Sequence, residues 1–471
     1  MTEKKTAIAE AYMQKQLKGA LTEGVIWKQI LRYFFPILLG TFFQQLYNTV
    51  DAWVVGNFVD AAQKDASLAA VGGTTGAVIA LIVNFFVGLS SGATVVLSQR
   101  YGRGDEDGAR KATHTAIALS VVGGAVLMVI GILLTPWSLT AMGVTEEVID
   151  GAISYMRIYF AGIIGNLLYN MGSGILRAIG DSKRPMIFLI ICCLLNIVLD
   201  LLFVAVFHMG VAGAAIATIL AQAISAALVL ITLARAKGEC YALHVKELRM
   251  DRVLLPEILR IGLPIGLQST MYNIANVIIQ SNINSFGTAA MAANTAYGRI
   301  DSMFWMIIGA YGVTLVTFVG QNYGAVKYER IRRGAVTCSV LSAATTILIT
   351  ALMLIFGRPL LGIFTDSEEV LKVGLTMMAW EAPFYISYVP IEMLSGTMRG
   401  MGNSLSPMLT ICGGICGFRL LWLFAVLPLN KTVPMLMLSY GLSWTLTSIL
   451  MLIIFINFGK KAFLFGENKL Q

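Results

Sequence analysis

The sequence contains little charge. Asp, Glu, Lys and Arg together make up 13% of the 471 residues, whereas hydrophobic residues make up 57%, and the mean hydropathy is +0.76. A water-soluble protein of this length needs more polar side chains to cover its surface. The composition therefore excludes a soluble globular protein and predicts an all-α polytopic membrane protein.

Residues that commonly hold metals or form disulfides are also scarce. The three histidines and six cysteines show neither metal-ligand nor disulfide spacing. No phosphate-binding loop and no catalytic-triad motif occurs. We therefore expect no cofactor, no resident metal and no enzymatic activity, and we expect transport energy to come from an ion gradient. The polar, Lys-rich start of the sequence is not typical of a cleavable signal peptide.

The net charge of +8 does not indicate nucleic-acid binding, because of where the charge lies. Lys and Arg gather in short segments between apolar runs, such as Lys183–Arg184 and the stretch 235–252, while the alternate loops are acidic or uncharged. This is the positive-inside pattern. It predicts a multi-pass protein of the cell membrane, surrounded by lipid, with both termini in the cytoplasm.

Apolar runs long enough to cross a hydrocarbon core of ~30 Å predict about twelve helices. We expect them at 29–54, 67–97, 107–135, 147–177, 185–206, 210–235, 256–284, 289–319, 329–357, 367–399, 405–428 and 433–458.

The chain also repeats itself. Ser173–Met186 returns as Ser395–Met408, an offset of 222 (395 − 173 = 222), and the same offset carries Tyr101 onto Tyr323. A duplicated half of six helices starts on the same side of the membrane each time, so the two lobes are expected to be parallel repeats. The predicted organisation is a cytoplasmic segment 1–28, an N-lobe 29–235, a cytoplasmic linker 236–255, a C-lobe 256–458 and a cytoplasmic tail 459–471.

Ionisable residues inside apolar runs are costly and therefore mark candidate functional sites. The first half contains Asp51 and Asp200. Gln44, Asn48 and Asp51 follow one helical face, and Asn196 and Asp200 are four residues apart on another. Thr218 follows a run of small residues that permits close helix approach.

Two carboxylates, an amide and a hydroxyl form a set of hard oxygen ligands suited to a small cation such as Na⁺, and two close carboxylates can also hold one proton between them. The alternative is that Asp51 and Asp200 only bond neighbouring helices. The repeat supplies an internal comparison, because the second half has no such set. The positions that correspond to Asp51, Asn196, Asp200 and Thr218 are Ile279, Phe418, Trp422 and Tyr440.

Pro36 lies inside the first predicted helix, where it removes a backbone hydrogen bond and predisposes the helix to bend. It is either a hinge or a tolerated membrane proline.

The second half contains its own intramembrane charges: Arg299, Asp301, Glu381, Glu392 and Arg419. Three acids and two bases favour a mutually paired structural network over a second ion-coupling site. Asn273, Asn276 and Gln280 form a neutral stripe that can line a cavity. Tyr272, with other aromatic residues and Met, either forms a soft wall for ligands or simply packs.

The ordered and duplicated motifs resemble the multidrug and toxic compound extrusion (MATE) family of secondary exporters. The resemblance extends from about Trp27 to Gly459. It rests on the following elements: Gln44…Tyr47-Asn48…Asp51, Gln99–Gly102 and its counterpart Gln321–Gly324, Leu176–Asp181 and Met398–Asn403, Asn196…Asp200, and Thr218.

This resemblance implies two six-helix lobes that form a V-shaped cleft, and exchange of Na⁺ or H⁺ for organic, mainly cationic compounds by alternating access. It implies that Asp51, Asn196, Asp200 and Thr218 couple the ion. The expected substrate cavity is formed by Gln44, Tyr47, Asn48, Asn166, Asn170, Tyr272, Asn273, Asn276 and Gln280. Where some members have an acid in the seventh helix, this chain has Met271-Tyr272-Asn273, which argues against a C-lobe cation site.

The second hypothesis is a flippase for lipid-linked oligosaccharide or cell-wall precursor, for which a strongly cationic cleft is expected. The third is a receptor or scaffold, which needs no buried acidic pair. The neutral and acidic stripes favour export of cationic compounds, and we expect the exporter to be a monomer.

Overall fold

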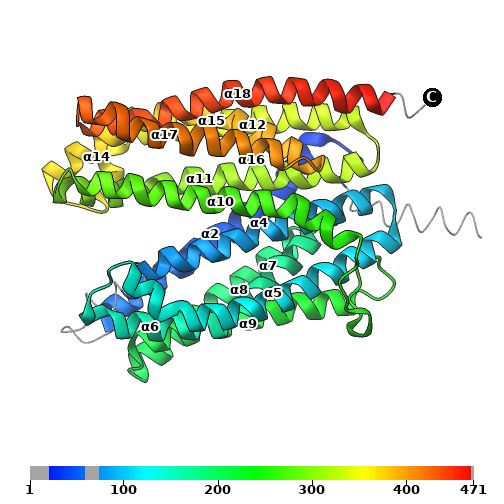
Figure 1. Ribbon diagram of the computed structural model, residues 1–471, viewed down its shortest axis with the longest axis horizontal. Helices are drawn as coiled ribbons and strands as arrows, with labels where there is room; N and C mark the ends of the chain where they lie inside the picture. Colours follow the sequence, from blue (N-terminus) through cyan, green and yellow to red (C-terminus); the bar gives the residue numbers. More distant parts are fainter. Residues whose placement is uncertain (1–20, 59–69, 71–73, 468–471) are drawn as a thin grey trace, which may run out of the picture. The chain divides into compact units, whose positions relative to one another are not determined.

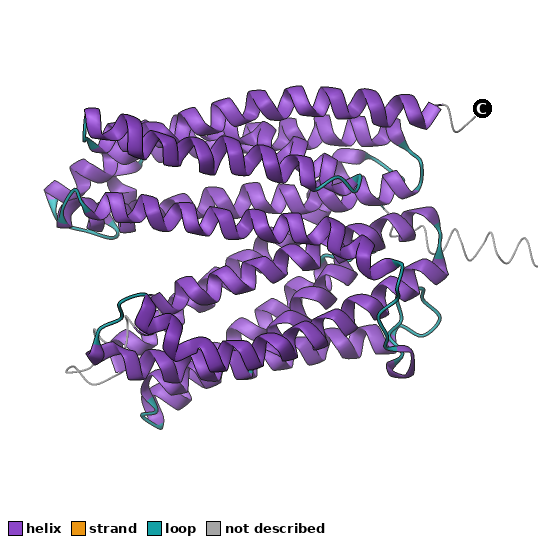
Figure 2. Cartoon of the chain, in the orientation of Figure 1, coloured by secondary structure: helices purple, strands orange, loops and turns teal. Residues whose placement is uncertain are grey.

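The structure is a computed structural model that describes residues 21–58, 70 and 74–467. These residues form helices joined by loops, and no β-strand occurs among them (Figures 1 and 2). Eight of the described helices are long and apolar enough to cross a membrane, or nine if the bent pair at 146–178 is one span. The long helices α2 (Ile26–Phe58) and α10 (Leu254–Asn284) are not among these eight. The prediction of an all-α membrane protein is confirmed.

The chain packs as two compact units. Unit 1 contains Phe35–Gly266, and unit 2 contains Leu21–Phe34 and the described chain from Leu267 onward. The first helix of each half contributes to both units, because α2 and α10 cross these boundaries. The boundaries of these compact units therefore fall inside helices.

The helices of unit 1 follow the predicted ranges closely. They are most of α2 (Ile26–Phe58), then α4 (Thr74–Arg103), α5 (Glu106–Ala141), α6 (Glu146–Ala161), α7 (Ile163–Ala178), α8 (Lys183–Asp200), α9 (Gly210–Arg235) and the start of α10 (Leu254–Asn284). The predicted helix 147–177 bends by 48° between α6 and α7.

Unit 2 repeats this series. After α10 it contains α11 (Thr288–Gly324), α12 (Tyr328–Ile355), the short α13 (Gly357–Gly362), α14 (Glu368–Glu381), α15 (Tyr385–Gly400), α16 (Leu405–Ile411), α17 (Phe418–Leu421) and α18 (Val433–Glu467). The predicted helix 405–428 is a chain of α-helical and π-helical turns, with π-helical turns at Cys412–Gly417 and Trp422–Val426. A π-helical turn at Leu201–Val206 also follows α8. Such turns are frequent at functional sites.

Glycines bring α4 and α10 into close contact in unit 1. A Cβ on Gly88 would overlap the backbone of Gly266, and a Cβ on Gly92 would overlap the backbone of Gly262. Close approach of this kind is how small residues stabilise helix pairs in membranes.

In unit 2 the segment 21–34 packs on α11 and α12. The ring of Phe34 stacks on Tyr311 with centroids 4.0 Å apart, and the Tyr33 hydroxyl donates to Thr317 Oγ1 at 3.3 Å. Arg330 donates to the Glu23 carbonyl at 2.8 Å.

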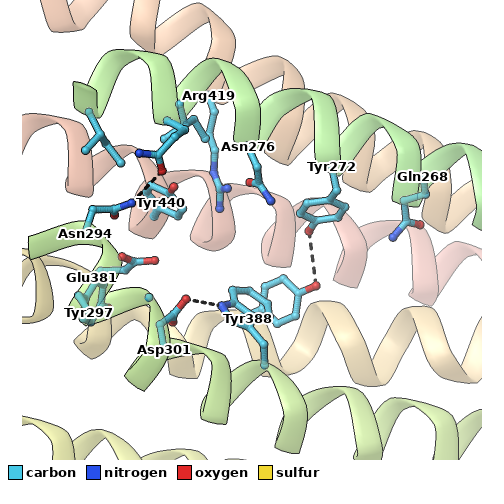
Figure 3. A pocket seen from close by; sticks show the side chains of 15 residues that line it. Gln268, Tyr272, Asn276, Asn294, Tyr297, Asp301, Glu381, Tyr388, Arg419 and Tyr440 are labelled. Atoms are coloured by element: carbon cyan, nitrogen blue, oxygen red, sulfur yellow. Dashed lines mark hydrogen bonds between the residues drawn. The ribbon is translucent and has the colours of Figure 1, made fainter. Parts of the chain in front are cut away.

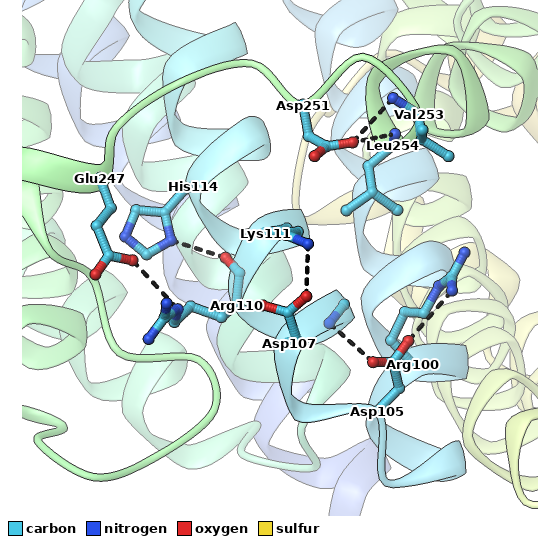
Figure 4. A network of polar contacts seen from close by, with 11 residues as sticks. Arg100, Asp105, Asp107, Arg110, Lys111, His114, Glu247, Asp251, Val253 and Leu254 are labelled. Atoms are coloured by element: carbon cyan, nitrogen blue, oxygen red, sulfur yellow. Dashed lines mark hydrogen bonds and ion pairs between the residues drawn. The ribbon is translucent and has the colours of Figure 1, made fainter.

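The segment between α9 and α10 is fixed to α5 (Figure 4). His114 Nε2 accepts a hydrogen bond from the His244 backbone N–H at 3.0 Å, while His114 Nδ1 donates to the Arg110 carbonyl at 2.7 Å. Arg110 also pairs with Glu247 at 3.2 Å. Ligand atoms of His114, His244 and Glu247 lie within 4.8 Å of one another, but both ring nitrogens of His114 already bond the protein. The cluster therefore fastens the segment.

Two aspartates mark the starts of α5 and α10 (Figure 4). The Gly108 N–H donates to Asp105 at 2.9 Å, and this bond, with Arg100, lowers the pKa of the Asp105 carboxyl. Asp251 accepts from the backbone N–H groups of Val253 and Leu254 at 2.9 and 3.1 Å, which lowers its pKa. Both carboxylates satisfy backbone donors that a helix leaves free at its first turn.

Candidate functional site

Three helices of unit 1 bring the predicted ion ligands together. Asp51 comes from α2, Asn196 and Asp200 from α8, and Thr218 from α9. Thr218 Oγ1 donates to Asp51 Oδ2 at 3.3 Å, and the Asp51 carboxyl also interacts with the side chains of Asn196 and Asp200. All four residues are buried.

Among the described residues, most of the oxygens in this cluster form no hydrogen bond of normal geometry. They are Asp51 Oδ1, both carboxylate oxygens of Asp200 and the Asn196 amide oxygen, and the Asn196 nitrogen is also unpaired. Buried polar groups are normally paired. Within the part of the chain that the structure describes, no Lys, Arg or His forms an ion pair with Asp51 or Asp200. The donor set therefore suits a small cation or a proton, with oxygen ligands only.

The local sequence explains how the cluster forms. Asp200 is the last residue of α8 before the π-helical turn Leu201–Val206. Small buried residues such as Ala214 and Ala217 let α9 approach. Val54, Val55, Val204 and Ala214 form an apolar cluster among the same segments, so the carboxylates lie beside low-dielectric packing.

The predicted polar stripe of α2 is only partly correct. Asp51 is buried, but Asn48 is exposed and Gln44 is half-buried. Tyr47, four residues before Asp51, is buried in place of Asn48. The buried face of this part of α2 is therefore formed by Tyr47, Asp51, Val54 and Val55, which follow helical spacing.

The sequence interpretation missed a tyrosine–glutamine group next to this face. Gln222 lies four residues after Thr218 on α9, and its side chain interacts with the hydroxyls of Tyr47 and Tyr159. The i, i+4 spacing of Thr218 and Gln222 was the available signal. Tyr155 also lies near the Asp51 carboxylate.

The remaining predicted N-lobe residues lie on α7 and α2. Asn170 Nδ2 donates to Asn166 Oδ1 at 3.0 Å, so this pair bonds within its own helix. Pro36 is buried inside α2, two residues after Phe34, where unit 2 gives way to unit 1. Pro264 of α10 lies two residues before Gly266, at the other boundary.

Unit 2 contains a cavity of about 520 Å³ with residues of both charges on its wall (Figure 3). Its polar lining includes Gln268, Tyr272, Asn276, Gln280, Asp301, Glu381 and Arg419. Asn276 and Gln280 lie on the cavity as predicted. Asn273 is not among the lining residues, and its amide donates to the Ser269 carbonyl of its own helix at 3.0 Å.

Asp301 is held by two donors. The Tyr385 hydroxyl lies 2.5 Å from Oδ1, and Trp305 Nε1 donates to Oδ2 at 2.8 Å. The hydroxyls of Tyr297 and Tyr385 are 2.8 Å apart. This network fixes the carboxylate in place and keeps it hydrogen-bonded.

Arg419 is buried and packs on aromatic rings. Its guanidinium carbon lies 4.1 Å from the centroid of Tyr440 and 5.3 Å from that of Trp444, which is the geometry of a cation–π contact. Nε donates to Ser443 Oγ at 2.9 Å. Nη2 is buried without a partner.

The predicted network of paired charges is not formed. Among the described residues, Arg419 makes no ion pair with Asp301, Glu381 or Glu392. Arg299 is exposed, and Glu392 packs against Gly312, where an added Cβ would overlap its carboxylate. The direct contacts of Arg419 are with Tyr440, Trp444 and Ser443. Those of Asp301 are with Tyr385 and Trp305.

The two repeats use equivalent positions differently. Ile279 and Tyr440, the counterparts of Asp51 and Thr218, line the cavity of unit 2. Tyr440 packs on Arg419, which directly follows Phe418, the counterpart of Asn196. The part of unit 2 that corresponds to the carboxylate cluster therefore contains a guanidinium.

Comparison with known proteins identifies the family. A family model described as MatE matches residues 36–202 and 264–423. The chain belongs to the MatE family. MatE proteins are membrane transporters, so the chain is a transporter and not an enzyme.

Curated MatE relatives match most of the chain. The chain is 30% identical over 394 residues to the probable multidrug resistance protein YpnP of Bacillus subtilis, covering 82% of this chain and 84% of that protein. It is 22% identical over 397 residues to the multidrug export protein MepA of Staphylococcus aureus, with 82% and 84% covered. The fold is similar to a crystal structure of MATE in the bent conformation, with a TM-score of 0.86, 22% identity, and 95% and 98% of the two chains covered.

Proposed function

We propose that this MatE protein is a secondary active multidrug exporter that exchanges Na⁺ or H⁺ for organic, mainly cationic compounds. The similarity to YpnP, a probable multidrug resistance protein, and to MepA, a multidrug export protein, supports multidrug export. The observation that carries the ion-coupling proposal is the buried set of unpaired oxygens at Asp51, Asn196 and Asp200. We also propose a monomer in the cell membrane with both termini cytoplasmic, as the positive-inside pattern predicts.

The four ligand residues have different roles in this proposal. Asp51 and Asp200 supply the charge that the ion neutralises. Asn196 and Thr218 supply neutral oxygens, and the Thr218 hydroxyl keeps Asp51 oriented at 3.3 Å. A cation bound here removes the negative field that attracts a cationic substrate, so ion and substrate weaken each other's binding by the same factor.

The substrate cavity proposed in unit 1 includes Gln44, Tyr47, Asn48, Asn166 and Asn170. Tyr47 supports this proposal best, because it lies on the same buried face as Asp51. Bending of α2 at Pro36 is a proposed way to transmit ion binding, since the proline removes a backbone hydrogen bond inside the helix.

Counterflow in proteoliposomes tests the proposal. Purified protein is reconstituted with an imposed Na⁺ or pH gradient, and uptake of a fluorescent cationic dye is measured. At least one gradient should drive dye accumulation, and Asp200→Asn should abolish it while leaving the protein folded, because an amide cannot be neutralised by the ion. The matched control is Asp150→Asn, which changes an exposed acid of α6 and should transport normally. Full gradient-driven transport by Asp200→Asn would refute the coupling role.

A further inference from the structure

The cavity of unit 2 carries charges of both signs that form no ion pair among the described residues. Asp301 and Glu381 lie on its wall with Arg419, and Figure 3 shows the guanidinium of Arg419 reaching toward the cavity beside Asn276 and Tyr440. Opposite charges buried in one cavity normally pair, because pairing offsets their desolvation. Within the described part of unit 2 these three groups do not form an ion pair.

Arg419 has the capacity to bind an anionic group. The side chain is only 2% exposed, its single hydrogen bond among the described residues runs from Nε to Ser443, and Nη2 is buried without a partner. Tyr440 and Trp444 hold the guanidinium in place by stacking. A guanidinium fixed in this way is suited to a carboxylate or phosphate, which it binds by charge-assisted hydrogen bonds.

Asp301 and Glu381 make the other part of the cavity wall suited to a cationic group, whereas Arg419 is suited to an anionic one. Asp301 is oriented by Trp305 and Tyr385, and Glu381 is 4% exposed on the same wall. Trp305, Tyr388 and Tyr272 add aromatic surface, which attracts organic cations through the ring faces. The volume of about 520 Å³ is in the range of cavities that hold drug-sized ligands.

We infer that this cavity binds zwitterionic organic compounds, with the anionic group of the ligand on Arg419 and its cationic centre near Asp301 and Glu381. The inference rests on the proposed function, because it names a substrate class for the exporter. A purely cationic ligand leaves the guanidinium unpaired, and a purely anionic ligand faces two carboxylates. Only a ligand with both charges satisfies both sides of the cavity.

The repeat argues that this cavity is distinct from an ion site. Ile279 and Trp422 occupy the positions of Asp51 and Asp200, so the oxygen set of unit 1 has no counterpart here.

The test uses two dyes that differ at one group. Rhodamine 110 is a zwitterion with a free carboxylate, and rhodamine 123 is its cationic methyl ester. Binding of each to the purified protein in detergent at pH 7.5 is measured by fluorescence polarisation, without any ion gradient. The wild-type protein should bind rhodamine 110 at least about tenfold more tightly, as expected for a charge-assisted hydrogen bond. Equal affinities, or tighter binding of the ester, would overturn the inference.

Variants of Arg419 test whether this residue causes the preference for rhodamine 110 over rhodamine 123. Arg419→Gln should remove the preference by weakening rhodamine 110 binding about tenfold or more, with little loss of rhodamine 123 binding. Arg419→Lys keeps the charge and should keep a preference for the zwitterion. This variant is measured in place of Arg419→Gln if the glutamine variant does not fold. Arg299→Gln is the matched control, because Arg299 is exposed on α11, and it should behave as wild type. Equal loss of both dyes in a folded Arg419 variant would also contradict the inference.

The binding assay separates this inference from the coupling proposal. Asp200→Asn should retain the Arg419-dependent dye preference even though it loses gradient-driven transport. If wild-type protein prefers the zwitterionic dye but shows no ion-driven transport, the coupling proposal is refuted and this inference is supported. If it shows ion-driven transport but no dye preference, the coupling proposal is supported and this inference is refuted.

Discussion

The Thr218 hydroxyl donates to Asp51 Oδ2 at 3.3 Å, although the two residues are 167 positions apart. The bond joins α9 to α2 inside unit 1. It uses one carboxylate oxygen and leaves Asp51 Oδ1 unpaired beside Asp200 and Asn196. Thr218 therefore orients the Asp51 carboxylate and leaves the other oxygens of the cluster available for an ion.

We predict that Thr218→Val weakens ion coupling without abolishing it. The substitution removes one neutral oxygen and one hydrogen bond but keeps both carboxylates, so the coupling ion's half-saturating concentration should rise by up to about tenfold. The measurement is transport rate as a function of Na⁺ and of pH. Thr232→Val is the control, because among the described residues the Thr232 hydroxyl bonds only the Leu228 carbonyl of the same helix at 2.7 Å. An identical ion dependence in both variants would count against a role for Thr218.

We predict that Gly88→Ala and Gly92→Ala destabilise the protein. A Cβ at either position would overlap the backbone of α10 at Gly266 or Gly262, so the helices must separate, at a cost of about 1–3 kcal/mol. Gly309→Ala is the control, because nothing lies within 4 Å of an added Cβ there, and alanine favours a helix interior. Thermal inactivation in detergent should be faster for the first two variants and unchanged or slower for the third. Equal inactivation of all three would show that the α4–α10 contact is not tight.

Tyr385→Phe should destabilise unit 2. The hydroxyl donates to Asp301 and bonds Tyr297, and its removal leaves a half-buried carboxylate short of one donor, at a cost of about 1–3 kcal/mol. The midpoint of thermal unfolding should fall. Ser302→Ala removes a hydroxyl whose single hydrogen bond within the described residues is to the Arg299 carbonyl, and it should leave the midpoint almost unchanged. A tyrosine variant as stable as wild type would mean that the Asp301 network contributes little to folding.

Acid sensitivity should depend on Asp105. Its pKa is lowered in the folded protein, chiefly by the Gly108 N–H and also by Arg100. The stabilisation is therefore complete above the unfolded pKa of about 3.9 and is lost as pH falls through the lower folded value. The stability difference between wild type and Asp105→Asn should stay constant above about pH 5 and shrink below about pH 4. A difference that grows toward acid pH would contradict this linkage.

The sequence was sufficient to predict the helices and most of the ion cluster. Long apolar runs fix where helices form, and Asp51, Asn196, Asp200 and Thr218 stood out because polar groups are rare in such runs. Helical spacing then placed Asn196 and Asp200 on one face, and the structure shows them near Asp51.

The arrangement of charges in unit 2 was not predictable in the same way. Counting acids and bases suggested pairing, but Arg419 stacks on Tyr440 and Trp444, and Asp301 takes its donors from Trp305 and Tyr385. These contacts depend on which side chains meet across helices, which composition does not specify. For the same reason, the exposure of Asn48 could not be predicted.

The most direct test of the central claim is the effect of ions on substrate affinity. A fluorescent cationic dye is titrated into purified protein against increasing Na⁺ at fixed pH, and then against decreasing pH at fixed Na⁺. If Asp51 and Asp200 hold the coupling ion, dye affinity should fall with at least one ion, and Asp200→Asn should remove that dependence. Dye affinity that is independent of both ions would contradict ion exchange and favour a facilitator or a scaffold.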